Sequence, residues 1–87
     1  MVNYNVPRDA LILAERSVGS GELVTTYYAT PDGELYKVAD WKWSRPVPTN
    51  PLEVCALCGD SFTTLQARIR LWLREREVFA ELPLDRA

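Results

Sequence analysis

The chain has 87 residues, a formal net charge of −2 and no histidine. Its length and its composition, 47% hydrophobic and 25% charged, predict one small folded domain spanning residues 1–87. The absence of histidine removes the usual general base and the commonest metal ligand, and the sequence pI of about 5.0 makes nucleic acid a less expected partner than another protein.

The first segment that could form regular structure, residues 7–17, fits two conformations. A strand over residues 11–18 would be joined to the following strand by the Gly-Ser-Gly tripeptide at residues 19–21. A short N-terminal helix would instead end at Gly19. We favour the helix because the apolar residues fall at helical spacing. Its apolar stripe would consist of Ala10, Leu11, Leu13 and Ala14.

A β-hairpin over residues 23–30 and 34–43 is the clearest predicted element. The first run is rich in Val, Thr and Tyr, which strands prefer. Residues 31–33, Pro-Asp-Gly, supply the turn, because proline presets its own φ and glycine accepts a positive φ. The sequence therefore predicts a small antiparallel sheet at the centre of the chain.

Aromatic residues are dense in this hairpin. Strand alternation places Tyr36 and Val38 on one face of the second strand. Trp41 and Trp43 fall on the other face, unless a bulge near residues 39–40 brings all four side chains together. The simplest interpretation is that these aromatic residues cover the small sheet. The functional interpretation assigns Trp41 and Trp43 to a surface that binds a partner, because tryptophan is enriched in interface anchors.

Residues 44–52 contain three prolines and read as a connector. Prolines at positions 46, 48 and 51 favour an extended, stiff backbone of the polyproline type. The segment is therefore expected to link the hairpin to the C-terminal helix without regular structure of its own.

Cys55 and Cys58 form the motif Cys-x-x-Cys-Gly, which resembles a zinc knuckle, where two thiolates hold a metal from a tight turn. With Phe62, the segment also resembles the first half of the zinc finger that has two cysteine and two histidine ligands. The likeness ends there, because Leu71 occupies the position of the first histidine and the chain has no second cysteine pair. Two chains could complete one four-thiolate zinc site across a twofold axis.

The cysteine pair therefore has three interpretations: packed thiols at the start of the helix, a metal site, or a redox pair. We favour packed thiols and no cofactor, because cysteine behaves as a small hydrophobe. Two cysteines without a visible signal peptide predict a cytoplasmic protein. No stretch is long and apolar enough to cross a membrane.

Residues 61–82 predict one long C-terminal helix. Thr63 is the expected N-cap, with Gln66 completing a capping box, and Pro83 ends the run. The helix carries more apolar surface than docking on one sheet requires. One apolar side comprises Leu65, Ile69, Trp72, Leu73, Phe79 and Ala80, a second comprises Ala67, Leu71, Val78 and Leu82, and the polar face comprises Arg70, Arg74, Glu77 and Glu81.

We expect this surplus surface to meet another protein chain. The expected contact residues on the helix are Arg68, Trp72, Arg76 and Phe79. The simpler alternative, which we favour for Arg76, is that its stem covers Trp72 while its charged head reaches water.

The sequence thus predicts an α+β fold, in which a small antiparallel sheet packs against a long C-terminal helix, with a short N-terminal helix. The expected function is an acidic protein–protein interaction module, an adaptor or inhibitor of phage or regulatory type, without catalytic activity. A homodimer is one arrangement that would cover the helix. The alternative function is a zinc-knuckle accessory domain for nucleic acid or transcription, built on Cys55 and Cys58.

Overall fold

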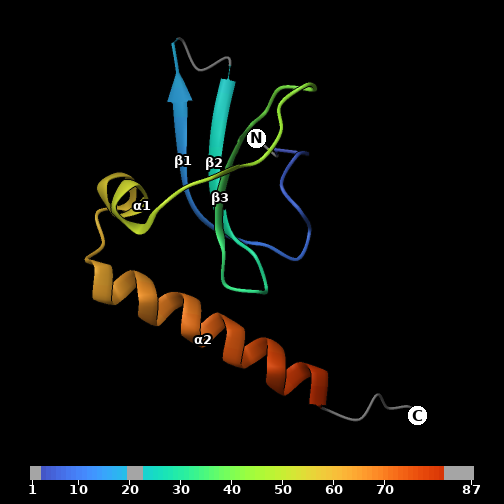
Figure 1. The fold of residues 1–87 in the computed structure, drawn as a ribbon, viewed down its shortest axis with the longest axis vertical. Coiled ribbons are helices and arrows are strands. Elements are labelled where there is room, and N and C mark those ends of the chain that lie inside the picture. Colours follow the sequence, from blue (N-terminus) through green and yellow to red (C-terminus); the bar gives the residue numbers. More distant parts are fainter. Residues whose placement is uncertain (1–2, 20–22, 82–87) are drawn as a thin grey trace.

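The computed structural model describes residues 3–19 and 23–81, apart from the side chains of residues 18 and 78–81. The described residues form a four-stranded antiparallel sheet in the order β1-β2-β3-β4, followed by two helices (Figure 1). The predicted α+β class, with a sheet and a long C-terminal helix packed on it, is confirmed. The elements are β1 (Leu11–Val18), β2 (Leu23–Ala29), β3 (Leu35–Ala39), β4 (Val47–Pro48), α1 (Pro51–Cys58) and α2 (Phe62–Glu81).

The predicted hairpin is present as β2 and β3. Its turn is closed by two backbone hydrogen bonds, from Thr30 N–H to the Glu34 carbonyl at 2.9 Å and from Gly33 N–H to the Thr30 carbonyl at 2.8 Å. Gly33 has a φ of 86°, a conformation that L-residues with a Cβ rarely adopt. The second strand is shorter than expected, since it ends at Ala39 rather than at residue 43.

The predicted N-terminal helix is wrong, and the strand alternative over residues 11–18 is confirmed as β1. The sequence pattern of this segment was misleading because the strand contains a β-bulge. Ile12 pairs with Tyr28 and Ala14 pairs with Tyr27, so Leu13 is an extra residue in the ladder. The bulge lets Leu13 and its apolar neighbours reach one cluster, although their spacing is not strict alternation. The residues of β1 in or against that cluster are Leu11, Leu13 and Ala14.

The main core lies between the sheet and the two helices. Tyr27 and Ala29 of β2 are buried there, and they meet Val54 from α1 and Leu65 from α2. Burying such side chains is the main favourable contribution to folding of a small chain. The helices are therefore attached to the sheet through one buried residue each, with half-buried neighbours around it.

The N-terminal segment covers the opposite face of the sheet. Thr26 and Val38 are buried on that face, and the side-chain amide of Asn3 donates to the Thr26 hydroxyl at 3.1 Å and to the Val38 carbonyl at 3.0 Å. Tyr28 and Tyr36 stack there with ring centroids 5.9 Å apart. Both faces of β2 are thus covered, which explains why its last four residues are buried in sequence.

The predicted connector contains regular structure after all. Its residues 47–48 pair with β3 as the short strand β4. Helix α1 then begins at Pro51, because the Asn50 side chain accepts from the Glu53 N–H at 2.9 Å and proline is favoured in a first helical turn. The helix ends at Gly59, whose φ of 79° places it in the left-handed C-cap conformation.

Glu53 attaches α1 to the sheet through polar contacts. Its carboxylate accepts hydrogen bonds from the Tyr27 hydroxyl, the Lys37 ammonium and the Thr49 hydroxyl, each at 2.8 Å. These donors, the Lys37 hydrogen bond foremost, lower the pKa of Glu53 from 4.5 to about 2. Glu53 is therefore ionised in the folded protein over the whole physiological pH range.

Helix α2 has the expected length but a different N-cap. The Ser61 hydroxyl, rather than that of Thr63, accepts from the Thr64 N–H at 3.1 Å. Leu65 is buried, while most of the helix lies across the lower end of the strands in Figure 1. The Cα radius of gyration is 14.6 Å, above the ~12 Å of a compact domain of this length. The helix therefore widens the molecule rather than closing over its core.

Candidate functional site

Three large aromatic side chains are exposed at one end of the molecule, and we call them the aromatic end. Tyr4 is 88% exposed, Trp41 is 52% exposed and Trp43 is 71% exposed. They come from the N-terminal segment and from the loop between β3 and β4. Exposed tryptophan and tyrosine are the side chains most enriched in interface anchors.

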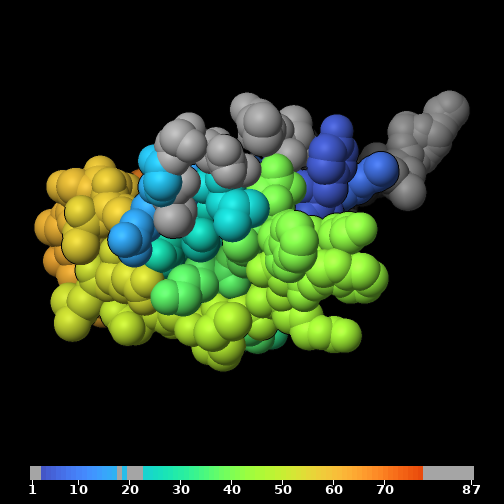
Figure 2. Space-filling model, turned by 90° about the horizontal axis from the view of Figure 1, so that it is seen from above, coloured from blue at the N-terminus to red at the C-terminus, as the bar shows by residue number. Residues whose placement is uncertain are grey.

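Hydrogen bonds hold the two segments of the aromatic end side by side. The side-chain amide of Asn5 donates to the backbone carbonyls of Ala39 and Trp41, both at 2.8 Å. The Ser44 N–H also donates to the Trp41 carbonyl at 2.8 Å. Figure 2 shows the blue N-terminal segment against the green loop, far from the yellow and orange helices. The exposed rings therefore project from a fixed backbone.

The loop between β3 and β4 places the tryptophans differently from the sequence prediction. Because β3 ends at Ala39, Trp41 and Trp43 lie beyond the strand. The sequence predicts them within it, on the face opposite Tyr36 and Val38, or on the same face if a bulge intervenes. The alternative bulge near residues 39–40 is not in the described ladder of β2 and β3, whose register is continuous from Leu35 to Ala39. Both tryptophans are exposed, and their contact with a partner stays a prediction.

The aromatic end is positively charged where the tryptophans lie. Lys42 and Arg45 are exposed on the same loop, whereas Asp40 is half-buried. The Lys42 ammonium lies 5.2 Å from the ring centroid of Trp43, within the range of a cation–π contact. A partner surface with acidic groups around an apolar centre would complement this loop.

The helix residues predicted to bind a partner are largely engaged within the chain. Trp72 is half-buried against the core cluster, and the Arg76 guanidinium lies 5.4 Å from its ring centroid. This geometry supports the alternative in which Arg76 covers the tryptophan. Arg68 pairs with Asp60 at 2.9 Å. The side chain of Phe79 lies outside the described part of the structure.

The second apolar side of α2 is exposed at its described positions. Ala67 is exposed, and the Leu71 side chain is 57% exposed. Arg70 and Arg74 flank these residues and are exposed as well. This is the surplus apolar side that the sequence predicted, and within the described residues the chain does not cover it.

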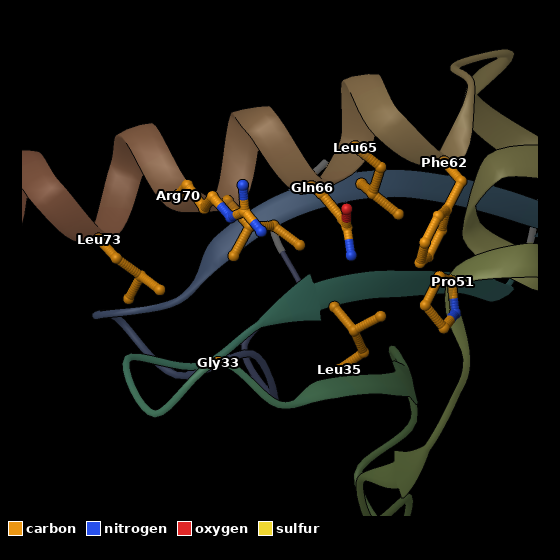
Figure 3. Close-up of a pocket in the computed structure, with 9 residues that line it drawn as sticks. Gly33, Leu35, Pro51, Phe62, Leu65, Gln66, Arg70 and Leu73 are labelled. Atoms are coloured by element: carbon orange, nitrogen blue, oxygen red, sulfur yellow. The ribbon is translucent and has the colours of Figure 1, made fainter.

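A shallow groove of about 260 Å³ runs between α2 and the β2–β3 turn (Figure 3). Figure 3 shows Leu35 of β3 below it and Phe62, Leu65 and Leu73 of α2 above it. Among its lining residues only Gln66 and Arg70 are polar. These two side chains supply one amide and one guanidinium to a lining that is otherwise apolar.

The cysteine pair lies on the last turn of α1, not on the tight turn expected of a zinc knuckle. Both thiols are free and half-buried. Burial is the main cause that raises the pKa of the Cys55 thiol, and the nearby Asp60 carboxylate adds to it, so this thiol stays protonated at neutral pH. Within residues 3–19 and 23–81, no three His, Cys, Asp or Glu side chains form a group that could hold a metal.

Sequence reasoning missed Tyr4 as a surface residue and the position of its neighbour Asn5. A polar N-terminal segment with no periodic pattern carries no signal for where it packs. The exposure of Leu71 could be anticipated, because it belongs to the second apolar side of the helix.

No protein-family model, curated protein or solved structure matches this chain. None of the described helices is both long and apolar enough to span a lipid bilayer.

Proposed function

We propose that this protein is a protein–protein interaction module that acts by docking its aromatic end onto another protein, without catalysis. It would work as an adaptor or inhibitor. The partner would present an apolar pocket with an acidic rim, which complements the tryptophans and the exposed Lys42 and Arg45. The free thiols of the chain suit a reducing, cytoplasmic setting.

The observation that carries this proposal is that Trp43 is 71% exposed on a loop whose backbone is held by hydrogen bonds. Leaving a large aromatic ring in water forgoes the free energy of burying it. Because the loop is held by the Asn5 hydrogen bonds, docking would order few additional groups, and a preorganised anchor binds at lower entropic cost.

The chemistry of the chain supports a non-catalytic role. The sequence has no histidine, and the groove beside α2 is lined mainly by apolar side chains. The thiol with the perturbed pKa, Cys55, is shifted toward its protonated, less reactive form.

Affinity capture from the native host, followed by mass-spectrometric identification, tests the proposal. The wild-type chain is compared with Trp41→Ala/Trp43→Ala, and Leu52→Ala is the matched control, since Leu52 is 76% exposed on α1, away from the aromatic end. A protein captured by the wild type and the control but lost with the double variant supports docking through the tryptophans. Equal capture by all three chains contradicts it.

A second candidate function, nucleic-acid binding, is favoured by the pairing of Lys42 with Trp43. Single-stranded nucleic acids bind to surfaces that combine cations with exposed aromatic rings. Quenching of tryptophan fluorescence by a single-stranded oligonucleotide, reversed by salt, would favour this candidate. The overall net charge of −2 argues for the protein partner instead.

The zinc form of that candidate makes a separate prediction. The described residues offer Cys55 and Cys58, whereas structural zinc takes about four ligands, so two chains would have to share one ion. We expect native mass spectrometry to find no retained zinc, and Cys55→Ser/Cys58→Ser to keep the fold. Zinc at one per chain or one per dimer that is lost in Cys58→Ser would favour the second candidate.

A further inference from the structure

The exposed side of α2 has the spacing of a helix-pairing seam. Ala67, Leu71 and Arg74 are exposed and are separated by four and then three residues along α2. This alternation of four and three is the repeat by which two helices pack together. We call Ala67, Leu71 and Arg74 the outer stripe.

We propose that the outer stripe pairs with the same stripe of a second copy of this chain, with the two α2 helices antiparallel. The proposal goes beyond the interaction function above, because it assigns a second surface to self-pairing. It leaves the aromatic end, which lies at the other end of the molecule in Figure 1, open for a different partner.

The charges beside the stripe favour the second copy as its occupant. Arg70 and Glu77 lie on one flank at equivalent positions of the repeat, and both are exposed. In an antiparallel pair, each flanking position of one helix lies beside the equivalent flanking position of the other helix. Arg70 of each copy therefore lies beside Glu77 of the other.

The stripe itself selects the antiparallel orientation. A parallel pair would place Arg74 directly against Arg74 of the second copy, and like charges in a seam repel. In the antiparallel pair, Arg74 lies against Leu71 of the other copy. Its aliphatic stem can cover the leucine while its guanidinium reaches solvent. The two ion pairs among the described residues, Lys37–Glu53 and Arg68–Asp60, leave Arg70 and Glu77 unengaged by such pairs.

Charge reversal in two separate chains tests the pairing. In Arg70→Glu both flank positions are acidic, and in Glu77→Arg both are basic. Each variant alone should repel itself and raise the dissociation constant of the dimer by about tenfold. An equimolar mixture should form a heterodimer as tight as the wild type, because every contact is again between opposite charges. Sedimentation velocity over a concentration series measures all four samples.

The mixing step separates pairing from effects within one chain. Arg70 and Glu77 are seven residues apart, so they are not neighbours on one helix, and mixing cannot restore contacts inside a chain. Arg8→Glu and Glu15→Arg make the same charge changes at exposed positions on the opposite face of the sheet from α2, and they should sediment as the wild type does. A replacement in the seam, Leu71→Glu, should give a monomer with unchanged helix content by circular dichroism.

Three results would overturn the proposal: a wild type that stays monomeric at every concentration, a dimer that survives Leu71→Glu, or single variants that weaken the dimer but are not rescued by mixing. None of these results bears on capture of a partner through Trp41 and Trp43, so the proposed function can fail or stand independently.

Discussion

At the scale of single residues, the Glu53 side chain connects α1 to three other segments of the fold. Its carboxylate binds Tyr27 of β2, Lys37 of β3 and Thr49 of the segment before α1. Its pKa is about 2 in the folded chain, below the ~4.3 of an unfolded glutamate. A lowered folded pKa adds stability above the unfolded value and loses it as the pH falls toward the folded value.

Glu53→Gln should therefore lower stability at neutral pH and flatten its dependence on pH between about 5 and 2. Glutamine keeps the shape and can still accept hydrogen bonds, but it lacks the charge that attracts Lys37. Urea unfolding measured at a series of pH values checks this. Glu34→Gln, an exposed glutamate, is the control and should keep the wild-type slope. A wild-type slope in Glu53→Gln would show that this carboxylate is not the acid-sensitive group.

At the scale of secondary-structure elements, α2 depends on few anchors. Leu65 is 1% exposed and lies in the core cluster, whereas Ile69 and Trp72 are only half-buried against it. The strands are held together by their own backbone hydrogen bonds, and Glu53 additionally attaches α1 to the sheet. Detachment of α2 is therefore governed mainly by Leu65.

Leu65→Ala should destabilise the protein by about 2–5 kcal/mol, the usual cost of removing a buried leucine side chain. A chain of this size has only about 4–13 kcal/mol in total, so the variant should be close to unfolding at room temperature. Chemical denaturation followed by circular dichroism measures the change. Leu52→Ala should lie within about 0.5 kcal/mol of the wild type because Leu52 is exposed. Equal stability of both variants would mean that α2 is not anchored at Leu65.

The elements that could be predicted from sequence are those whose local signals agree with their packing. The hairpin combines strand-forming residues with a Pro-Asp-Gly turn, and α2 combines length with helical periodicity. β1 was misjudged because the bulge at Leu13 breaks strand alternation and imitates helical spacing. The start of α1 was missed because the prolines of residues 44–52 indicated an extended connector. Asn50 before Pro51 is nevertheless a helix-initiation signal.

The candidate site was predictable only in part, for a related reason. The exposure of Leu71 follows from a helix with two apolar sides and one core. The aromatic end depends instead on tertiary hydrogen bonds, from Asn5 to the backbone around Trp41, that join segments more than thirty residues apart in sequence. Local patterns cannot reveal such a contact.

At the scale of the whole molecule, the two exposed surfaces lie at different ends. The loop with Trp41 and Trp43 projects at the top of Figure 1, and α2 crosses the bottom. A dimer formed through α2 would present two aromatic ends outward. Such an arrangement would let one assembly hold two copies of a partner, which raises the apparent affinity for a multivalent target.

The measurement that tests the central claim most directly is the affinity of the captured partner, determined by calorimetry with purified proteins. Trp41→Ala/Trp43→Ala should bind at least about tenfold more weakly than the wild type, as expected when anchor residues are truncated. Leu52→Ala should bind as the wild type does, and thermal unfolding should show that both variants are folded. A folded Trp41→Ala/Trp43→Ala chain that binds with wild-type affinity would contradict docking through the aromatic end.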